Sequence, residues 1–106
     1  MEKRKPHFPL AQVKALLKAE KVRFTKVAYA GAAALGMGRL DMLKVISELS
    51  MDVFDKSMTS NRDSTRWMDV YKLKVEARDI YLKLAIEDEL LVISFKENTD
   101  EMLHLR

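Results

Sequence analysis

The chain has 106 residues, of which 48% are hydrophobic and 33% charged, and its net charge is +3. This length suffices for one domain with a single core, and the composition is typical of a globular protein. The apolar runs are too short for a membrane span, the N-terminus is too charged for a signal peptide, and cysteine is absent. These features fit a cytoplasmic protein without disulfides, and the mild basic excess permits an anionic partner without requiring one.

The first half of the chain has apolar residues at helical spacing. After two prolines, a stripe of leucine and valine predicts a helix from about Leu10 to Ala19. Thr25 is a candidate N-cap for a second helix, which Gly36 would end. A third helix is expected after Gly38. Its predicted apolar stripe is Met42, Leu43, Ile46 and Leu49.

The second half of the chain predicts strands, because apolar and polar residues alternate there. The four expected strands are 54–59, 67–74, 80–86 and 90–96, with polar turns between them. Helices followed by strands predict an α+β fold, in which N-terminal helices pack on one face of a C-terminal antiparallel β-sheet. The domain would comprise residues 1–97, and residues 98–106 would form a C-terminal tail.

The last two strands form a predicted hairpin, and its register decides which side chains share a face. Gathering the apolar residues of both arms on one face sets Tyr81 opposite Lys96 on the other face. Lys83 then lies opposite Ser94. The apolar pairs expected on the core face are Ile86 with Leu91, Leu84 with Ile93, and Leu82 with Phe95.

A basic sheet face with aromatic side chains is one way to hold single-stranded RNA. The same pattern also occurs on ordinary solvated faces, so the residues alone leave both interpretations open. No Gly-rich phosphate loop is present, the acidic residues lack metal-ligand spacing, and the only histidines are His7 and His104. Any catalysis would therefore have to use lysine and tyrosine.

Short motifs follow one another in a fixed order along nearly the whole chain. They are MEKR-PH at the start, KSMTS at 56–60, Trp67 with DVY at 69–71, YLK at 81–83 and VISFKE at 92–97. In this order and spacing they resemble the MqsR toxins. This family is the ribonuclease half of a bacterial toxin–antitoxin pair and belongs to the RelE-like group.

The resemblance implies an mRNA interferase, an endoribonuclease that cuts messenger RNA at short GC-containing sites such as GCU and so inhibits translation. It further implies neutralisation by an MqsA-like antitoxin with zinc-binding and helix-turn-helix domains, and binding of operator DNA only as the toxin–antitoxin complex. No cofactor or membrane contact is implied. The family's active-site residues match Lys56, Tyr81 and Lys96. A fourth family position is glutamine, and this chain has Met68 there.

Metal-independent cleavage by the ribose 2′-hydroxyl needs a base, a group that stabilises charge on the phosphate, and an acid for the leaving oxygen. We assign the base role to Lys56, charge stabilisation to Lys96 and proton donation to Tyr81, although the two lysines could exchange roles. Met68 leaves open an alternative, a catalytically impaired homologue that binds RNA or antitoxin in operator regulation. The expected RNA-binding residues are Met68, Arg66, Lys72 and Lys83.

Overall fold

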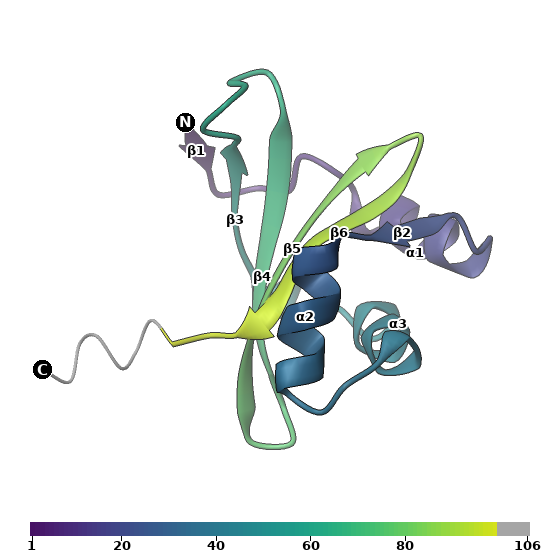
Figure 1. The fold of residues 1–106 in the computed structure, drawn as a ribbon. Coiled ribbons are helices and arrows are strands. Elements are labelled where there is room, and N and C mark those ends of the chain that lie inside the picture. The colour runs from purple at the N-terminus through teal and green to yellow at the C-terminus, as the bar shows by residue number, and fades with distance from the viewer. Residues whose placement is uncertain (100–106) are drawn as a thin grey trace, which may run out of the picture.

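The structure is a computed structural model that describes residues 1–99 (Figure 1). Within this range, three α-helices and one six-stranded sheet form an α+β domain, as predicted. Among the described residues, no helix has the length and apolar character needed to cross a bilayer. The predicted tail after Thr99 and His104 lie outside the described residues. In chain order the elements are β1 (Glu2–Lys3), α1 (Leu10–Lys18), β2 (Val22–Phe24), α2 (Lys26–Ala34), α3 (Arg39–Ser47), a 3₁₀ turn (Met51–Val53), β3 (Phe54–Thr59), β4 (Trp67–Val75), β5 (Arg78–Glu87) and β6 (Glu89–Glu97).

The helices begin and end close to the predicted positions. Thr25 caps α2, because its side-chain oxygen accepts a hydrogen bond from the backbone N–H of Ala28 at 3.0 Å. Gly36 follows the helix with φ at 74°, a conformation that glycine adopts without steric cost. One residue of the α3 stripe was wrong: Val45 is buried, whereas Leu43 is only partly so.

The sheet has the strand order β1-β3-β4-β5-β6-β2. Neighbouring strands are antiparallel except β2 and β6, which run parallel. Strands β1 and β2 were not predicted, because two or three residues are too few to display an alternating pattern. Figure 1 shows β1 at one edge, beside β3, and β2 at the other, beside β6.

The register of the β5–β6 hairpin is partly as predicted. Leu82 lies opposite Phe95, and the two neighbouring pairs on the other face also match. A β-bulge at Ile93 then shifts the register, because the bulged strand carries one extra residue. The carbonyl oxygen of Ile93 accepts a hydrogen bond from the hydroxyl of Thr25 at 2.7 Å. The predicted pairs Leu84–Ile93 and Ile86–Leu91 are therefore wrong, and the observed pairs are Leu84–Val92 and Ile86–Leu90.

All three helices and one side of the strands contribute side chains to a single core. Helix α2 lies against β6 (Figure 1) and approaches it closely at Gly31. A Cβ atom on Gly31 would come within 2.2 Å of the carbonyl oxygen of Phe95. The fully buried members of the core are Val13, Ala28, Ala32, Met42, Ile46, Tyr71, Ile80, Leu82, Leu84, Leu90, Val92 and Phe95.

Candidate active site

The sheet face opposite the core carries two neighbouring cross-strand rows, which we call the lysine face. Residues that lie directly opposite one another on adjacent strands point to the same side of a sheet. Tyr71, Leu82 and Phe95 face the core, so the residues beside them in each strand point the other way. One row consists of Lys56, Val70, Lys83 and Ser94, and the next of Lys72, Tyr81 and Lys96.

Tyr81 and Lys96 are paired on the lysine face. They are cross-strand neighbours on β5 and β6, in the register predicted from the sequence. The Nζ atom of Lys96 lies 5.3 Å from the centre of the Tyr81 ring, within the range of a cation–π contact. Lys72 lies opposite Tyr81 on the β4 side. The fold therefore brings a phenol and two ammonium groups into one row.

Lys56 shares this face, which the sequence could not establish. It lies opposite Val70 on β4, and Val70 lies opposite Lys83 on β5. Val70 and Ser94 are buried, so they form the floor of the row between the longer lysine side chains. The register thus places Lys56 two strands away from Lys83, on the same side of the sheet.

Burial and a neighbouring charge shift the pKa of Lys83 on this face. Its side chain is half-buried, and this burial lowers its pKa below the usual range for lysine. The positive charge of Lys96 lowers the pKa of Lys83 further, since two like charges disfavour each other. Lys83 therefore loses its proton more readily than an exposed lysine.

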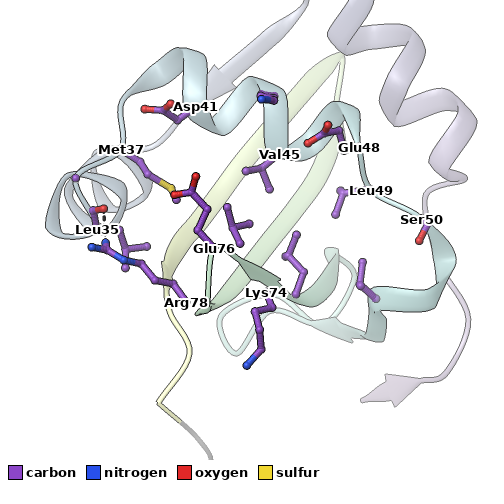
Figure 2. A pocket seen from close by; sticks show the side chains of 15 residues that line it. Leu35, Met37, Asp41, Val45, Glu48, Leu49, Ser50, Lys74, Glu76 and Arg78 are labelled. Atoms are coloured by element: carbon purple, nitrogen blue, oxygen red, sulfur yellow. Dashed lines mark hydrogen bonds between the residues drawn. The ribbon is translucent and has the colours of Figure 1, made fainter.

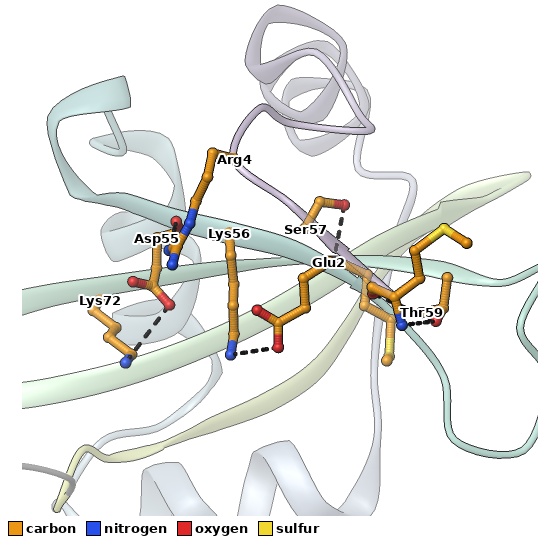
Figure 3. Close-up of polar contacts among 9 residues, drawn as sticks. Glu2, Arg4, Asp55, Lys56, Ser57, Thr59 and Lys72 are labelled. Atoms are coloured by element: carbon orange, nitrogen blue, oxygen red, sulfur yellow. Dashed lines mark hydrogen bonds and ion pairs between the residues drawn. The ribbon is translucent and has the colours of Figure 1, made fainter.

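Two carboxylates pair with lysines on this face (Figure 3). The Lys56 Nζ atom lies 3.3 Å from Glu2 Oε2, and the Lys72 Nζ atom lies 3.6 Å from Asp55 Oδ2. A register shift in β3 between Phe54 and Lys56 lets Asp55 and Lys56 both reach this side. Sequence reasoning missed Glu2, because no pattern at the second residue of a chain indicates a contact 54 residues away.

The other predicted RNA-binding residues lie further along β4. Met68 comes two residues before Val70 in β4, so both side chains point to the same face of the sheet. Met68 lies opposite Met58, which in turn lies opposite Glu2. Arg66 precedes β4 and forms an ion pair with Glu87 at the end of β5. The structure therefore places Met68 in the row next to Lys56, whereas Arg66 is held at the far end of the sheet.

The N-terminal segment is anchored to β4 by a buried carboxylate. Asp69 has no exposed surface and accepts hydrogen bonds from the backbone N–H groups of His7, at 3.0 Å, and Phe8, at 2.9 Å. The His7 ring stacks on Trp67 with centres 5.3 Å apart, and the Nζ atom of Lys3 lies 4.2 Å from the centre of the Trp67 ring. The segment before α1 is thus fixed at several points.

A cavity of about 590 Å³ lies away from the lysine face, between α3 and the β4–β5 hairpin (Figure 2). Its lining combines aliphatic side chains such as Val45, Leu49 and Leu73 with charged ones such as Glu48 and Arg78. Residues 1–99 contain no group of three or more His, Cys, Asp or Glu side chains placed to hold a metal ion. The candidate catalytic side chains therefore lie on the lysine face.

Comparison with known proteins agrees with the motifs in the sequence. Residues 5–97 match the model of the family described as "Motility quorum-sensing regulator, toxin of MqsA". The chain is also 44% identical, over 97 residues, to the mRNA interferase toxin MqsR of Escherichia coli (strain K12). That alignment covers 92% of this chain and 99% of the relative. This chain therefore belongs to the MqsR toxin family, as its motifs predicted.

Proposed function

We propose that this protein is the toxin of a type II toxin–antitoxin system and acts in the cytoplasm as an mRNA interferase. It cuts messenger RNA at short GC-containing sites such as GCU, which inhibits translation. The observation that carries the proposal is the cross-strand pair of Tyr81 and Lys96 on the lysine face of an MqsR-family fold. A relative that is 44% identical is named as an mRNA interferase, so a catalytically impaired homologue is not favoured.

The proposed catalytic residues are Lys56, Tyr81 and Lys96. Their shared face supports the proposal, since Lys56 is on β3, Tyr81 on β5 and Lys96 on β6. RNA binding across the face would neutralise lysine charges with phosphates, since phosphate contacts dominate nucleic-acid affinity. The proposed RNA-binding residues are Met68, Arg66, Lys72 and Lys83.

The proposed reaction is attack by the ribose 2′-hydroxyl on the adjacent phosphorus. The 2′-hydroxyl gives its proton to a base, a role that the sequence assigns to Lys56. The new bond joins the 2′-oxygen to phosphorus, and the bond from phosphorus to the 5′-oxygen breaks. The products are a 2′,3′-cyclic phosphate and a 5′-hydroxyl. Lys96 stabilises the extra negative charge on the phosphoryl oxygens. The phenol of Tyr81 donates its proton to the leaving 5′-oxygen.

Met68 is proposed to tune the rate or the base preference. The family carries a glutamine at this position, whose amide can donate and accept hydrogen bonds, whereas the thioether of methionine is only a weak acceptor. Met68 lies on β4 opposite Met58, two residues along the strand from Val70 in the floor of the lysine face. We expect Met68→Gln to change the cleavage rate or the preferred site and to leave the fold intact.

The finer details of fold and partners follow from family membership. We propose a RelE-like arrangement with the helices on one face of the sheet, supported by the single core that all three helices share with one side of the strands. The family is described as the toxin of MqsA, which supports an MqsA-like antitoxin with zinc-binding and helix-turn-helix domains. Operator DNA would be bound only through that complex. Residues 1–97 would form the toxin domain and residues 98–106 its tail.

The experiment compares cleavage of an RNA that contains one GCU site by the parent and by two variants. Tyr81→Phe removes the proton donor and Lys96→Ala removes the positive charge. Each should lower the single-turnover rate on the order of 10²-fold, the usual effect of one acid–base or electrostatic group. Matched controls are Tyr29→Phe on α2 and Lys18→Ala on α1, which make the same changes on exposed helix surfaces.

The products and their metal dependence test the reaction type. The new 5′ ends should be hydroxyls that a polynucleotide kinase can phosphorylate directly, and a 2′-deoxy substitution at the scissile nucleotide should block cleavage. Activity should persist in EDTA. Cleavage that needs an added divalent ion would refute the scheme, and parent-like rates in both site variants would remove Tyr81 and Lys96 from the site.

A further inference from the structure

The proposed catalytic set lacks a ready proton acceptor. The set consists of lysine and tyrosine side chains, and residues of these two types must lose a proton before they can accept one. A glutamate carboxylate is ionised at neutral pH and accepts a proton directly. The structure brings one such group to the site, because Glu2 Oε2 lies 3.3 Å from the Nζ atom of Lys56 (Figure 3).

Strand β1 holds Glu2 in this position. Glu2 lies opposite Met58, and Met58 comes two residues after Lys56 in β3. The side chains of Lys56, Met58 and Glu2 therefore all point to the lysine face. The backbone of Met1 is tied to Thr59: the N–H of Thr59 donates to the carbonyl oxygen of Met1 at 3.0 Å. The terminal ammonium group of Met1 also donates to Thr59 Oγ1 at 3.1 Å. These contacts fix the backbone on the N-terminal side of Glu2.

The residue after Glu2 is fixed on the opposite side of the sheet. Lys3 lies opposite Ser57, and its Nζ atom contacts the Trp67 ring and lies 2.9 Å from Nδ1 of His7. Adjacent residues of a strand point to opposite faces of the sheet. Holding Lys3 on the core face therefore keeps Glu2 on the lysine face. Glu2 is therefore a positioned side chain and not one of a frayed terminus.

Glu2 and Tyr81 lie on different strands of the lysine face, with β3 and β4 between them. In an in-line displacement the attacking and leaving oxygens lie on opposite sides of phosphorus, so the base and the acid must also approach from opposite sides. Glu2 and Lys56 approach from β1 and β3, whereas Tyr81 approaches from β5. A phosphate bound between them would have a carboxylate on one side and a phenol on the other.

We propose that Glu2 is the general base of the cleavage reaction, an inference that rests on the proposed function. The Glu2 carboxylate takes the proton of the 2′-hydroxyl as the bond from the 2′-oxygen to phosphorus forms. Tyr81 gives its proton to the 5′-oxygen as the bond from phosphorus to that oxygen breaks. Lys56, paired with Glu2, then binds the phosphate in place of the base role predicted from the sequence.

Asp55 supplies a matched control, because it is the second carboxylate paired with a lysine on this face. Its partner is Lys72, and the backbone carbonyl of Asp55 also accepts a hydrogen bond from Arg4 at 3.4 Å. Asp55→Asn removes the same charge from the same face as Glu2→Gln. The two variants therefore separate a specific loss of the base from a general change in surface charge.

The experiment measures single-turnover cleavage of the GCU RNA from pH 3.5 to pH 9 by four proteins. They are the parent, Glu2→Gln, Glu2→Asp and Asp55→Asn. Glutamine is chosen over alanine because a small second residue allows removal of Met1, which would also delete the contacts with Thr59. Binding is measured separately with the RNA that carries the 2′-deoxy substitution, so that a loss of affinity is not mistaken for a loss of chemistry.

Glu2→Gln should lower the rate on the order of 10²- to 10³-fold and abolish the fall in rate at acidic pH that a carboxylate base produces. Its affinity for the uncleavable RNA should be unchanged or higher, since a negative charge facing the phosphates is removed. Glu2→Asp should recover part of the rate and the acidic fall. Asp55→Asn should stay within about fivefold of the parent, because the Asp55–Lys72 pair is partly solvated and such a pair contributes on the order of 1 kcal/mol.

Thr59→Val tests the alternative that Glu2 only anchors β1. This variant removes the hydroxyl that contacts Met1 and should lower the rate by a similar factor at every pH. The inference is overturned if Glu2→Gln cleaves as the parent does or keeps the acidic fall in rate. A parent protein that cleaves no RNA would instead refute the proposed function, so the two failures are distinguishable.

Discussion

Gly31 lies where α2 approaches β6 most closely, and Gly31→Ala tests whether that contact holds the site together. In an ordinary helix interior, replacing glycine with alanine stabilises the protein by about 1 kcal/mol. Here a Cβ atom would come within 2.2 Å of the Phe95 carbonyl oxygen, 3.0 Å of the Lys96 Cβ and 3.1 Å of the Phe95 carbonyl carbon. We expect the steric effect to exceed the gain in helix propensity.

The size of the effect follows from these distances. An ordinary van der Waals contact begins near 3.4 Å, so α2 and β6 must separate by about 1 Å. The nearest atom belongs to the backbone of a strand that is paired with β5 at this point, so it cannot rotate away as a flexible side chain would. Overpacking costs typically 1–3 kcal/mol, and the upper end is expected here. After the gain in helix propensity, a net loss of about 2 kcal/mol remains.

The assay is urea unfolding, in which this loss should lower the midpoint by about 1 M. Gly38→Ala is the matched control, because a Cβ atom there has no heavy atom within 4 Å. The control should change stability by less than about 1 kcal/mol. RNA cleavage by Gly31→Ala should also fall while the protein is still folded, since the displaced strand carries Lys96. A Gly31→Ala protein as stable as the parent would refute the packing argument.

Two further substitutions test ionisable groups whose pKa values the fold shifts. Burial and the charge of Asp69 raise the pKa of Tyr71 to about 12, and its buried hydroxyl has no hydrogen-bond partner among the described residues. The folded protein keeps that proton more firmly than the unfolded chain, so the parent should lose about 1.4 kcal/mol of stability by pH 11. Tyr71→Phe should be at least as stable as the parent at pH 7 and should lack this loss, and equal urea midpoints for the parent at pH 8 and pH 11 would contradict the prediction. Burial and Lys96 lower the pKa of Lys83 in the folded protein, so the charged form of Lys83 destabilises the fold below that pKa. This loss of stability disappears as the pH rises towards the pKa that Lys83 has in the unfolded chain. Lys83→Met should therefore raise the melting temperature at pH 7 and lose this advantage near pH 10, whereas a lower melting temperature at pH 7 would show that the charge is well solvated.

The sequence predicted those parts of the site that depend on nearby residues. Tyr81 and Lys96 were paired correctly because their hairpin connects them directly and its apolar residues permit few registers. The ends of α2 were predicted because Thr25 and Gly36 act within one turn of the helix. The family was confirmed because its motifs extend along almost the whole chain.

The prediction of the β5–β6 pairing failed beyond Lys83, where tertiary contacts determine the backbone. The bulge leaves Ile93 without a paired residue on β5. The carbonyl oxygen of Ile93 instead accepts a hydrogen bond from the hydroxyl of Thr25, which lies 68 residues earlier in the chain. The alternation of apolar and polar residues in β6 does not reveal such a distant contact. The predicted alternation therefore continued through the bulge. The result was a core assignment of Ile93 and Leu91, whereas Val92 and Leu90 are buried.

By itself, the sequence determined the order of helices and strands, the caps and the Tyr81–Lys96 pair, because each depends on residues close together in the chain. Only the tertiary structure decided that Lys56 shares their face and that Glu2 contacts it. That contact requires a two-residue strand to pair with β3, and such a strand has no stability or pattern of its own. Its position is set by the anchors at Thr59, Trp67 and Asp69, which come together only in the folded protein.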